Sequence, residues 1–368
     1  MSSNEKLRSL IDLDLLEPAA VDQIEAALEL PFLKALAVMP DCHPGYHLPI
    51  GGVALLSEVV SPSYVGYDIG CGMCHVKTDM AAADLRGQED AVFSEVYRRI
   101  PVGFESRRTP VDYRDFKSAS GEKKLDKKVA GKLKVQLGTL GGGNHFIELG
   151  ETEDGSLAVT IHSGSRNMGH SIASHHMHAA KVKDNDLPQG FLRLRGKYGR
   201  EYVKDMEFAL EYALENRRIM MLEVLDVLGQ PNGLIGRMIN QNHNHAVVNR
   251  DGTVLHRKGA TPAEKGEPGI IPGNMRDGVY VTVGLGNRKY LCSASHGAGR
   301  TMSRKAAKKQ YSLTDFHDAM TGIKARVEPA TLDEAPFAYK NLDEVMAMQR
   351  GIVIDVVDRT RPLVNIKG

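Results

Sequence analysis

Short polar segments that carry histidine, cysteine, aspartate or asparagine recur along the chain, each at the end of an apolar run, and all but one of them contain glycine. They begin at Asp41 (DCHPGYHLPIGG), Tyr67 (YDIGCGMCH), Leu140 (LGGGNHFIELG), Ile161 (IHSGSRNMGH), Gln241 (QNHNH), His256 (HRKGA), Pro272 (PGNM) and Ser295 (SHGAGR). Glycine allows positive φ and lets the backbone approach a ligand closely. Polar side chains that leave strand ends in loops are well placed to converge on one site. The recurrence therefore indicates one shared pocket for metal and phosphate.

The bulk composition is that of a soluble globular protein, with 42% hydrophobic and 25% charged residues among 368. A formal net charge of +1 argues against a tail-driven nucleic-acid binder. Tryptophan is absent and aromatic residues make up 6%, so we do not expect base stacking to be the main binding device. Neither a membrane span nor a signal peptide is expected, and four cysteines do not make a disulfide framework. A cytoplasmic setting follows as the expectation.

Helical and strand-like patterns alternate without a regular βαβ order, which favours an α+β fold. Apolar residues recur at helical spacing over 17–30 and 202–228. The polar, lysine-rich stretch 106–134 reads as a flexible or substrate-covering segment. No linker divides the chain, so we expect a single domain over 1–368. Short β-rich runs predict strands at 53–56, 158–161, 279–283, 290–294 and 351–357.

A set of candidate metal-ligand side chains is spread over four of these polar segments: Asp68, Cys71, His145, His162 and His243. Carboxylate, thiolate and imidazole together suit a transition metal, and by softness alone zinc would be favoured. The pair Cys71 and Cys74 resembles half of a zinc site, but no second CxxC accompanies it.

The run 141–143 puts three glycines directly before a short apolar segment that holds Asn144, His145 and Glu148. If 144–149 is a strand, Asn144 and Glu148 share one face and His145 points to the other. The glycines then allow a nucleotide or metal to approach the backbone. The alternative is a tight turn entering a strand, with Asn144 bonding its own loop.

The segment SHGAGRTMSRKAAKK at 295–309 has the character of a phosphate-binding loop. A glycine loop holds His296, and a basic helix is predicted to begin near Thr301, so that loop amides and a helix N-terminus face the same region. Arg300 adds a guanidinium fork for phosphate oxygens. The spacing matches neither GxxxxGK[ST] nor GxGxxG. From this stretch alone, His296 is either a nucleophile or a hydrogen-bond donor.

Taken together, nine ordered motifs resemble the RtcB-type RNA ligase family, from about residue 33 to the end of the chain. They are MPDCHPGYHLPIGGV, VGYDIGCGM, QLGTLGGGNHFIEL, HSGSRNMGH, HNHAVV, HRKGAT, IIPGNM, SHGAGRTMSR and the terminal IKG. The resemblance implies the α+β fold of that family, with a deep central cleft for metal and nucleotide. It also implies two manganese ions. One would be held by Asp68, Cys71 and His145, and the other by Cys71, His162 and His243.

The resemblance further implies GTP as the nucleotide. His296 falls on the guanylylated histidine of the family, and Asp41 would orient its ring. Arg166 and Arg300 are the candidates for contacts to RNA phosphates. The residues implied to contact or lie beside the guanylate are Asn144, His145, Glu148, His243, Asn244, Pro272, Gly273, Asn274, Met275, His296, Gly297, Ala298, Gly299 and Lys367.

The implied reaction joins an RNA 3′-phosphate or 2′,3′-cyclic phosphate to a 5′-hydroxyl, in RNA repair or tRNA splicing. It would pass through guanylylated His296 and an RNA(3′)pp(5′)G intermediate, and some family members use a helper protein called archease. The alternative is a metal-dependent phosphodiesterase that only opens cyclic phosphates. Two positions depart from the family pattern, Asn274 in place of serine and Val279 before Tyr280. Both belong to the implied nucleotide pocket and bear on the strictness of GTP preference.

Overall fold

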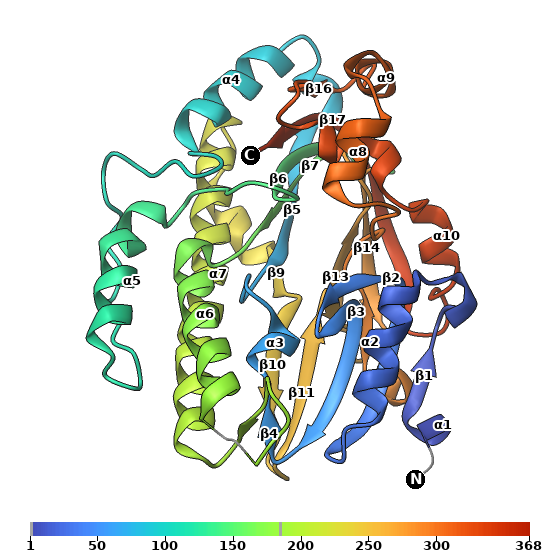
Figure 1. Cartoon of the computed structure of the whole chain (residues 1–368). Helices are drawn as coiled ribbons and strands as arrows, with labels where there is room; N and C mark the ends of the chain where they lie inside the picture. The colour runs from blue at the N-terminus through green and yellow to red at the C-terminus, as the bar shows by residue number, and fades with distance from the viewer. Residues whose placement is uncertain (1–2, 184–185) are drawn as a thin grey trace.

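The computed structural model describes residues 3–183 and 186–368, and it confirms the predicted α+β class (Figure 1). Two large β-sheets form the centre of the molecule, with long helices packed on one side of them. None of the helices in the described ranges is long and apolar enough to cross a membrane.

The first sheet has five strands in the order β1-β2-β3-β11-β10. Its neighbours are antiparallel except for the parallel pair β1 and β2. The long strand β2 contains Asp41, and β10 follows directly after His243. The bounds are β1 Leu7–Ser9, β2 Leu33–Tyr46, β3 Leu48–Ser57, β11 Thr253–Lys258 and β10 Asn244–Val248.

The second sheet has eight strands in the order β13-β14-β17-β6-β7-β5-β9, and β16 pairs with β17. All of its pairs are antiparallel except that of β16 with β17. The bounds are β13 Pro268–Pro272, β14 Val279–Gly284, β17 Ile354–Lys367, β6 Phe146–Glu151, β7 Ser156–Ser163, β5 Gly72–Ala81, β9 Ile239–Asn242 and β16 Lys324–Ala325.

Two short ladders complete the strand structure. One pairs β12, Ala260–Pro262, with β15, Ser293–Ser295, and the other pairs β4, Val59–Val60, with β8, Leu192–Arg193. Strand β12 contacts β3 of the first sheet as well as β9 and β13 of the second. The β12–β15 ladder therefore lies where the two sheets meet, and it delivers His296 to that junction.

Helices α6 and α7 run beside each other along the sheets, and α5 lies outside them (Figure 1). Helix α7 packs on β5, β7 and β9, where Met220 and Val224 join Val159 and Ile161 in one apolar core. The helices are α1 Ser3–Lys6, α2 Pro18–Leu28, α3 Pro62–Val65, α4 Glu89–Arg99, α5 Lys123–Gln136, α6 Arg166–Val182, α7 Lys197–Val227, α8 Arg304–Gln310, α9 Leu313–Ala319 and α10 Leu342–Ala347.

Both periodic patterns in the sequence form the predicted helices. The pattern over 17–30 becomes α2, which starts at Pro18 and buries Ile24. The pattern over 202–228 becomes α7, which begins five residues earlier, at Lys197, and is followed by Gly229 at a φ of 64°. Glycine is favoured there because a positive φ ends a helix without strain.

The strand predictions hold at 53–56, 158–161 and 279–283, within β3, β7 and β14. The prediction at 290–294 is mostly wrong, because 288–290 form a 3₁₀ turn and β15 starts only at Ser293. The prediction at 351–357 starts too early, since β17 begins at Ile354 and continues to Lys367. A register shift between Pro362 and Val364 accommodates the proline within this strand.

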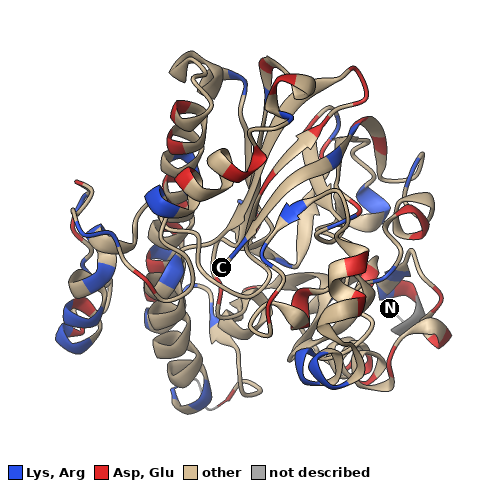
Figure 2. Ribbon diagram, turned by 90° about the horizontal axis from the view of Figure 1, so that it is seen from above, with Lys and Arg blue, Asp and Glu red and all other residues tan. Residues whose placement is uncertain are grey.

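The lysine-rich stretch 106–134 is not a cover for the site. Its second half belongs to α5, which buries Leu125, Val129 and Leu133 against α6 and α7. In the view from above, Lys and Arg alternate with Asp and Glu over most of the molecule, and lysines gather on α5 at the left edge (Figure 2). This basic helix lies far to one side of the chain's C-terminus, which is next to the pocket described below.

Candidate functional site

Four adjacent strands of the second sheet, β6, β7, β5 and β9, end at the same edge of the sheet and bring most of the proposed metal ligands together there. Phe146 of β6 pairs with His162 of β7, so His145 lies just beyond that pair. Gly72 of β5 pairs with Ser163 on one side and with Asn242 of β9 on the other. Cys71, one residue before Gly72, and His243, one residue after Asn242, are therefore neighbours as a direct consequence of strand register. Asp68 sits in the turn between α3 and β5.

We call Asp68, Cys71, His145, His162 and His243 the metal group, and their donor atoms lie close together. The Cys71 Sγ lies 3.1 Å from the His162 Nε2 and 3.5 Å from the His145 Nε2. The His145 Nε2 is 3.0 Å from the Asp68 Oδ2, and the Nε2 atoms of His162 and His243 are 3.3 Å apart. The structure thus forms two ligand triads that share Cys71, each with its donor atoms within 4.8 Å of one another. These are the two sets that the sequence resemblance implies.

In two of the imidazole rings, the hydrogen bond at Nδ1 determines that Nε2 is the nitrogen that faces the metal group. The Nδ1 of His145 lies 2.9 Å from the Leu140 carbonyl, and that of His162 lies 3.0 Å from the Asn144 carbonyl. A carbonyl only accepts, so each Nδ1 carries the proton and each Nε2 presents a lone pair. Burial, followed by the charges of neighbouring histidines, lowers the pKa of His162 and His243 well below the ordinary value. Neutral imidazole donors converging on a buried cysteine fit a bound cation.

Burial, followed by the charge of Asp68, raises the pKa of the Cys71 thiol well above its ordinary value. A coordinated cation reverses this balance, because a metal deprotonates the thiol that binds it. Cys71 is 3% exposed, whereas the side chain of Asp68 is 37% exposed. Asp68 is therefore the most solvent-accessible member of the metal group.

His296 connects the metal group to a pocket. Its Nδ1 lies 2.7 Å from the Oδ2 of Asp41, and the same oxygen accepts the backbone N–H of His296 at 3.1 Å. Asp41 is fully buried. A carboxylate only accepts, so Nδ1 is the donor, and in the neutral ring the lone pair is on Nε2. The rings of His296 and His243 have centroids 4.8 Å apart, in edge contact.

Two glycines of the polar segments have a definite steric role here. A Cβ on Gly141 would lie 2.1 Å from the Arg166 guanidinium and 2.6 Å from the His145 Nδ1. A Cβ on Gly259 would lie 2.4 Å from Ile50 and 3.0 Å from the His296 ring. Both have positive φ, 96° and 60°. The glycines thus leave room for the imidazoles to sit against the backbone.

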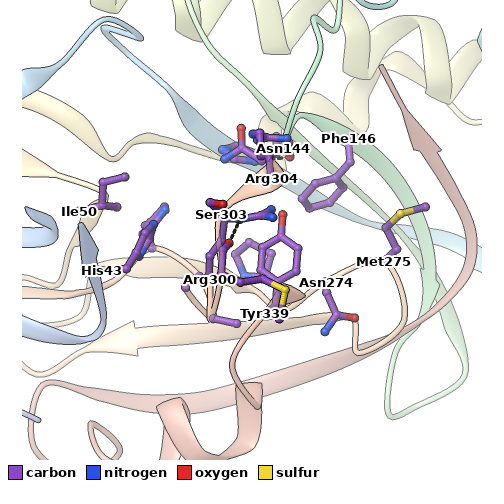
Figure 3. Close-up of a pocket in the computed structure, with 18 of the residues that line it drawn as sticks. His43, Ile50, Asn144, Phe146, Asn274, Met275, Arg300, Ser303, Arg304 and Tyr339 are labelled. Atoms are coloured by element: carbon purple, nitrogen blue, oxygen red, sulfur yellow. Dashed lines mark hydrogen bonds between the residues drawn. The ribbon is translucent and has the colours of Figure 1, made fainter. Parts of the chain in front are cut away.

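The pocket beside His296 has a cavity volume of about 470 Å³ (Figure 3). Asn144 and Phe146 lie above Tyr339 and Asn274 in this view. The sequence-predicted residues that line it are Asn144, Pro272, Gly273, Asn274, Met275, His296, Gly297, Ala298, Gly299, Arg300 and Lys367, and His162 of the metal group also reaches it.

Some predicted nucleotide residues do not line this pocket. Asn244 bridges two loops: its Oδ1 accepts the Gly259 N–H at 2.7 Å and its Nδ2 donates to the Asp68 carbonyl at 3.2 Å. Glu148 is buried behind Asn365, whose Nδ2 donates to it at 3.3 Å. Burial raises the pKa of Glu148 to about 8, against the hydrogen bonds from Thr360 and Asn365.

The two departures from the family pattern occupy different places. Asn274 lines the pocket, but its amide is already engaged with its own loop. Its Oδ1 accepts the N–H groups of Arg276 and Asp277, and its Nδ2 donates to the Asp277 carboxylate at 2.6 Å. Val279 is fully buried in an apolar cluster with Phe146 and does not line the pocket.

Both arginines proposed for RNA phosphates are held by the protein. Arg166, at a φ of 59°, donates to Thr139 and to the Gly103 carbonyl. Arg300 donates to the Met302 and Asp333 carbonyls, and it lines the pocket while Arg166 does not. Their contact with RNA stays a prediction.

Sequence reasoning missed several pocket residues. Asn365 lies two residues before Lys367 on β17, so both side chains share a face of the strand. Its Oδ1 is buried and has no protein partner, which leaves an acceptor beside the pocket. The alternation of side chains along a strand could have identified Asn365, because it places Asn365 on the same face as Lys367. Tyr339 and Arg304 come from elements whose placement the sequence pattern does not show.

A buried carboxylate organises the cations of the pocket. Glu334 accepts from the Lys367 Nζ at 2.7 Å and from the Tyr339 hydroxyl at 2.6 Å, and its other oxygen pairs with Arg304. Burial opposes ionisation of Glu334, but the charges of Lys367 and Arg304 outweigh it and lower the pKa to about 2. Glu334 therefore holds Lys367 in place at the pocket wall.

Replacing Glu334 by glutamine should lower the free energy of unfolding at pH 7 by about 3 kcal/mol, given the depression of its pKa from 4.5 to about 2. A depressed folded-state pKa stabilises above the unfolded value and loses that contribution as pH falls. The difference between wild type and Glu334→Gln, measured by urea denaturation, should therefore shrink from about pH 4.5 to about pH 2. The exposed pair of Glu328 with Arg326 supplies a control, since Glu328→Gln should change stability by under about 0.5 kcal/mol. A difference that stays constant with pH would contradict this account.

Comparison with known proteins was made for the whole chain. The family model described as tRNA-splicing ligase RtcB matches residues 23–123 and 116–368. The chain is 34% identical to the RNA-splicing ligase RtcB of Escherichia coli K12 over 387 residues, which covers 96% of this chain and 95% of that protein. It is 32% identical to the tRNA-splicing ligase RtcB of Pyrobaculum aerophilum, covering 90% of this chain and 87% of that protein. Since the family model matches most of the chain, and these relatives are over 30% identical to it across at least 90% of its length, the chain belongs to the RtcB family.

Proposed function

We propose that this protein is a GTP- and manganese-dependent RNA ligase, acting as one catalytic domain in the cytoplasm. It joins RNA 3′-phosphate or 2′,3′-cyclic phosphate ends to 5′-hydroxyl ends. The observation that carries the proposal is the position of His296. Asp41 holds its ring at the pocket wall, and the ring touches His243 of the metal group. The names of the relatives, RNA-splicing and tRNA-splicing ligases, support RNA as the substrate.

The reaction needs activation because hydroxide is a poor leaving group from a 3′-phosphate. The His296 Nε2 lone pair attacks the α-phosphorus of GTP, a P–N bond forms, and the bond to pyrophosphate breaks. An oxygen of the RNA 3′-phosphate then displaces the imidazole and takes the GMP. The 5′-hydroxyl attacks the RNA phosphorus and expels GMP. The Nδ1–H donates to Asp41, which orients the ring and fixes the tautomer of the neutral imidazole whose lone pair is on the attacking Nε2.

The metal group would hold two cations, one by Asp68, Cys71 and His145 and the other by Cys71, His162 and His243. Bound there, divalent cations supply charge neutralisation for the phosphates and for the attacking and leaving oxygens. His162 reaches the pocket, so this charge would act where the α-phosphate meets His296. The assignment of manganese rests on the family resemblance.

The nucleotide is assigned to the cavity of about 470 Å³, which falls in the usual range for small-molecule sites. Asn144, Lys367 and the N–H groups of Gly297 and Gly299 offer donors for phosphate oxygens, whereas the Ala298 N–H donates to the Pro272 carbonyl. The ring of Tyr339 and the free Oδ1 of Asn365 offer a stacking face and an acceptor for a purine. An archease-like activator is a further proposed partner.

A joining assay tests the proposal. Two short RNAs, one with a 3′-phosphate and one with a labelled 5′-hydroxyl end, are incubated with protein, GTP and Mn²⁺, and products are resolved by size. A joined product that needs GTP is expected, and the same assay with a 2′,3′-cyclic phosphate end should also yield it. If cyclic ends open but no joined product forms with any nucleoside triphosphate, the protein is a phosphodiesterase instead.

A further inference from the structure

Two tyrosines and two histidines lie in contact with one another in a row beside the metal group. His47 stacks on Tyr46 with ring centroids 4.5 Å apart, Tyr46 lies 6.0 Å from Tyr67, and Tyr67 stacks on His170 at 5.1 Å. Tyr46 is 41% and Tyr67 42% exposed. We call these four residues the ring row.

Three separate segments build the ring row. Tyr46 ends β2 and His47 follows it, Tyr67 lies between α3 and β5, and His170 is on α6. Single exposed aromatic residues are common and need no explanation. Here rings from three distant parts of the chain meet: the two outer pairs stack and the central tyrosines are tilted at 45°. Tyr46, Tyr67 and His170 are exposed and His47 is half-buried, so the row presents a continuous surface. Another planar ring could stack on the faces of these rings or contact their edges.

The ring row borders the candidate site at two points. Tyr67 directly precedes Asp68, the most exposed member of the metal group. Tyr46 follows His43 and Pro44, both of which line the nucleotide pocket. A chain whose reacting end lies between the metal group and His296 would therefore pass the ring row as it leaves past Asp68.

Positive charge accompanies the rings. Burial, followed by the charges of Lys258 and Lys181, lowers the pKa of His47. Lys181 is exposed on α6, the helix that carries His170, and so is available to a phosphate group. Exposed rings next to cations are the usual means of holding single-stranded nucleic acid, with bases stacked on rings and phosphates near lysine.

We propose that the ring row stacks an unpaired base of the RNA next to the end that is joined, with Tyr67 as the principal contact. The proposal rests on the ligase function and extends it to the substrate's path across the surface. It assigns RNA binding to residues outside both the nucleotide pocket and the metal group. The stacked base needs no particular identity, since every base has a π-face.

The absence of tryptophan from the chain provides a direct binding test. In Tyr67→Trp the new indole is the only tryptophan, so its fluorescence reports on position 67 alone. Addition of a single-stranded RNA with a 3′-phosphate, or separately one with a 5′-hydroxyl, should quench it, and an RNA with an abasic nucleotide next to that end should not. Val357→Trp is the matched control, because Val357 is 63% exposed and lies ten residues from Lys367 on β17. Its fluorescence should not respond.

Kinetics separate stacking from a structural role. Tyr67→Ala should raise the KM for RNA about tenfold and leave kcat near that of the wild type, and Tyr67→Phe should restore the KM. An abasic nucleotide should weaken binding to the wild type by a similar factor and should not weaken Tyr67→Ala further. Labelling of Tyr67→Ala by α-labelled GTP should match the wild type, because the ring row does not touch the pocket.

Several results would overturn the proposal. Equal quenching by intact and abasic RNA would exclude stacking, and an unchanged KM in Tyr67→Ala would exclude a binding role. Loss of GTP labelling in Tyr67→Ala would show that the ring only supports the Asp68 turn. A change in sedimentation without any change in RNA affinity would assign the row to contact between protein copies. Failure of the ligase function itself looks different, since wild-type protein would then neither label nor join RNA, whereas the fluorescence test needs no joining.

Discussion

Asp41→Asn is expected to lower the rate of guanylylation by a factor on the order of 10³–10⁴, with metal content unchanged. In a serine protease triad, the equivalent change of carboxylate to amide stabilises the wrong histidine tautomer and has an effect of about 10⁴. Here the amide would offer an N–H to the His296 Nδ1, and the proton would move to Nε2, the attacking atom. Single-turnover labelling with α-labelled GTP measures the rate.

A matched control exists within the same chain. His176 and Asp205 form a second buried pair, with Nε2 2.8 Å from Oδ2 and both side chains 1% exposed. It lies between α6 and α7, and neither residue lines the pocket. Asp205→Asn should lower stability but leave guanylylation at the wild-type rate. If both substitutions slow labelling equally, the effect of Asp41→Asn reflects general damage to the fold.

Cys71→Ala is expected to remove both metal ions, because Cys71 belongs to both ligand triads. Each ion would keep only two of its three protein ligands, and both ions would lose the negative charge of the Cys71 thiolate. Protein purified in Mn²⁺ and passed through a desalting column should contain about two ions per chain in the wild type and none in the variant, by elemental analysis.

Cys74→Ala is the control for this loss. Cys74 is three residues further along the chain, in β5, and is fully buried; its Sγ donates to the Arg217 carbonyl at 3.9 Å and belongs to neither ligand triad. Its replacement should leave the metal content unchanged. Retention of both ions by Cys71→Ala would show that the thiolate does not bridge them.

Periodic and motif-rich parts of the chain were predictable, and parts fixed by long-range packing were not. Apolar spacing alone identifies α2 and α7, because their buried faces are continuous. Strand β17 was missed over most of its length, since Pro362 and several charged residues interrupt the alternation that marks a strand. Its position between β14 and β6 determines its structure instead.

The same division applies to the site. Asp68, Cys71, His145, His162 and His243 stand out in the sequence because they flank strand ends, and strand register then brings them together. Glu334 shows no such signal, because it lies in a 3₁₀ turn at 332–334 and becomes central only through Lys367 and Arg304. The strand predicted to start at Asn144 begins instead at Phe146. Asn144 reaches the pocket from the preceding turn.

The most direct measurement of the central claim locates the covalent bond to the nucleotide. Protein incubated with α-labelled GTP and Mn²⁺ is denatured, digested and analysed by mass spectrometry. The account predicts a GMP adduct on the peptide that contains His296, labile in acid as a P–N bond is, and absent from His296→Ala. An adduct that persists in His296→Ala, or one found on a lysine such as Lys367, would contradict it.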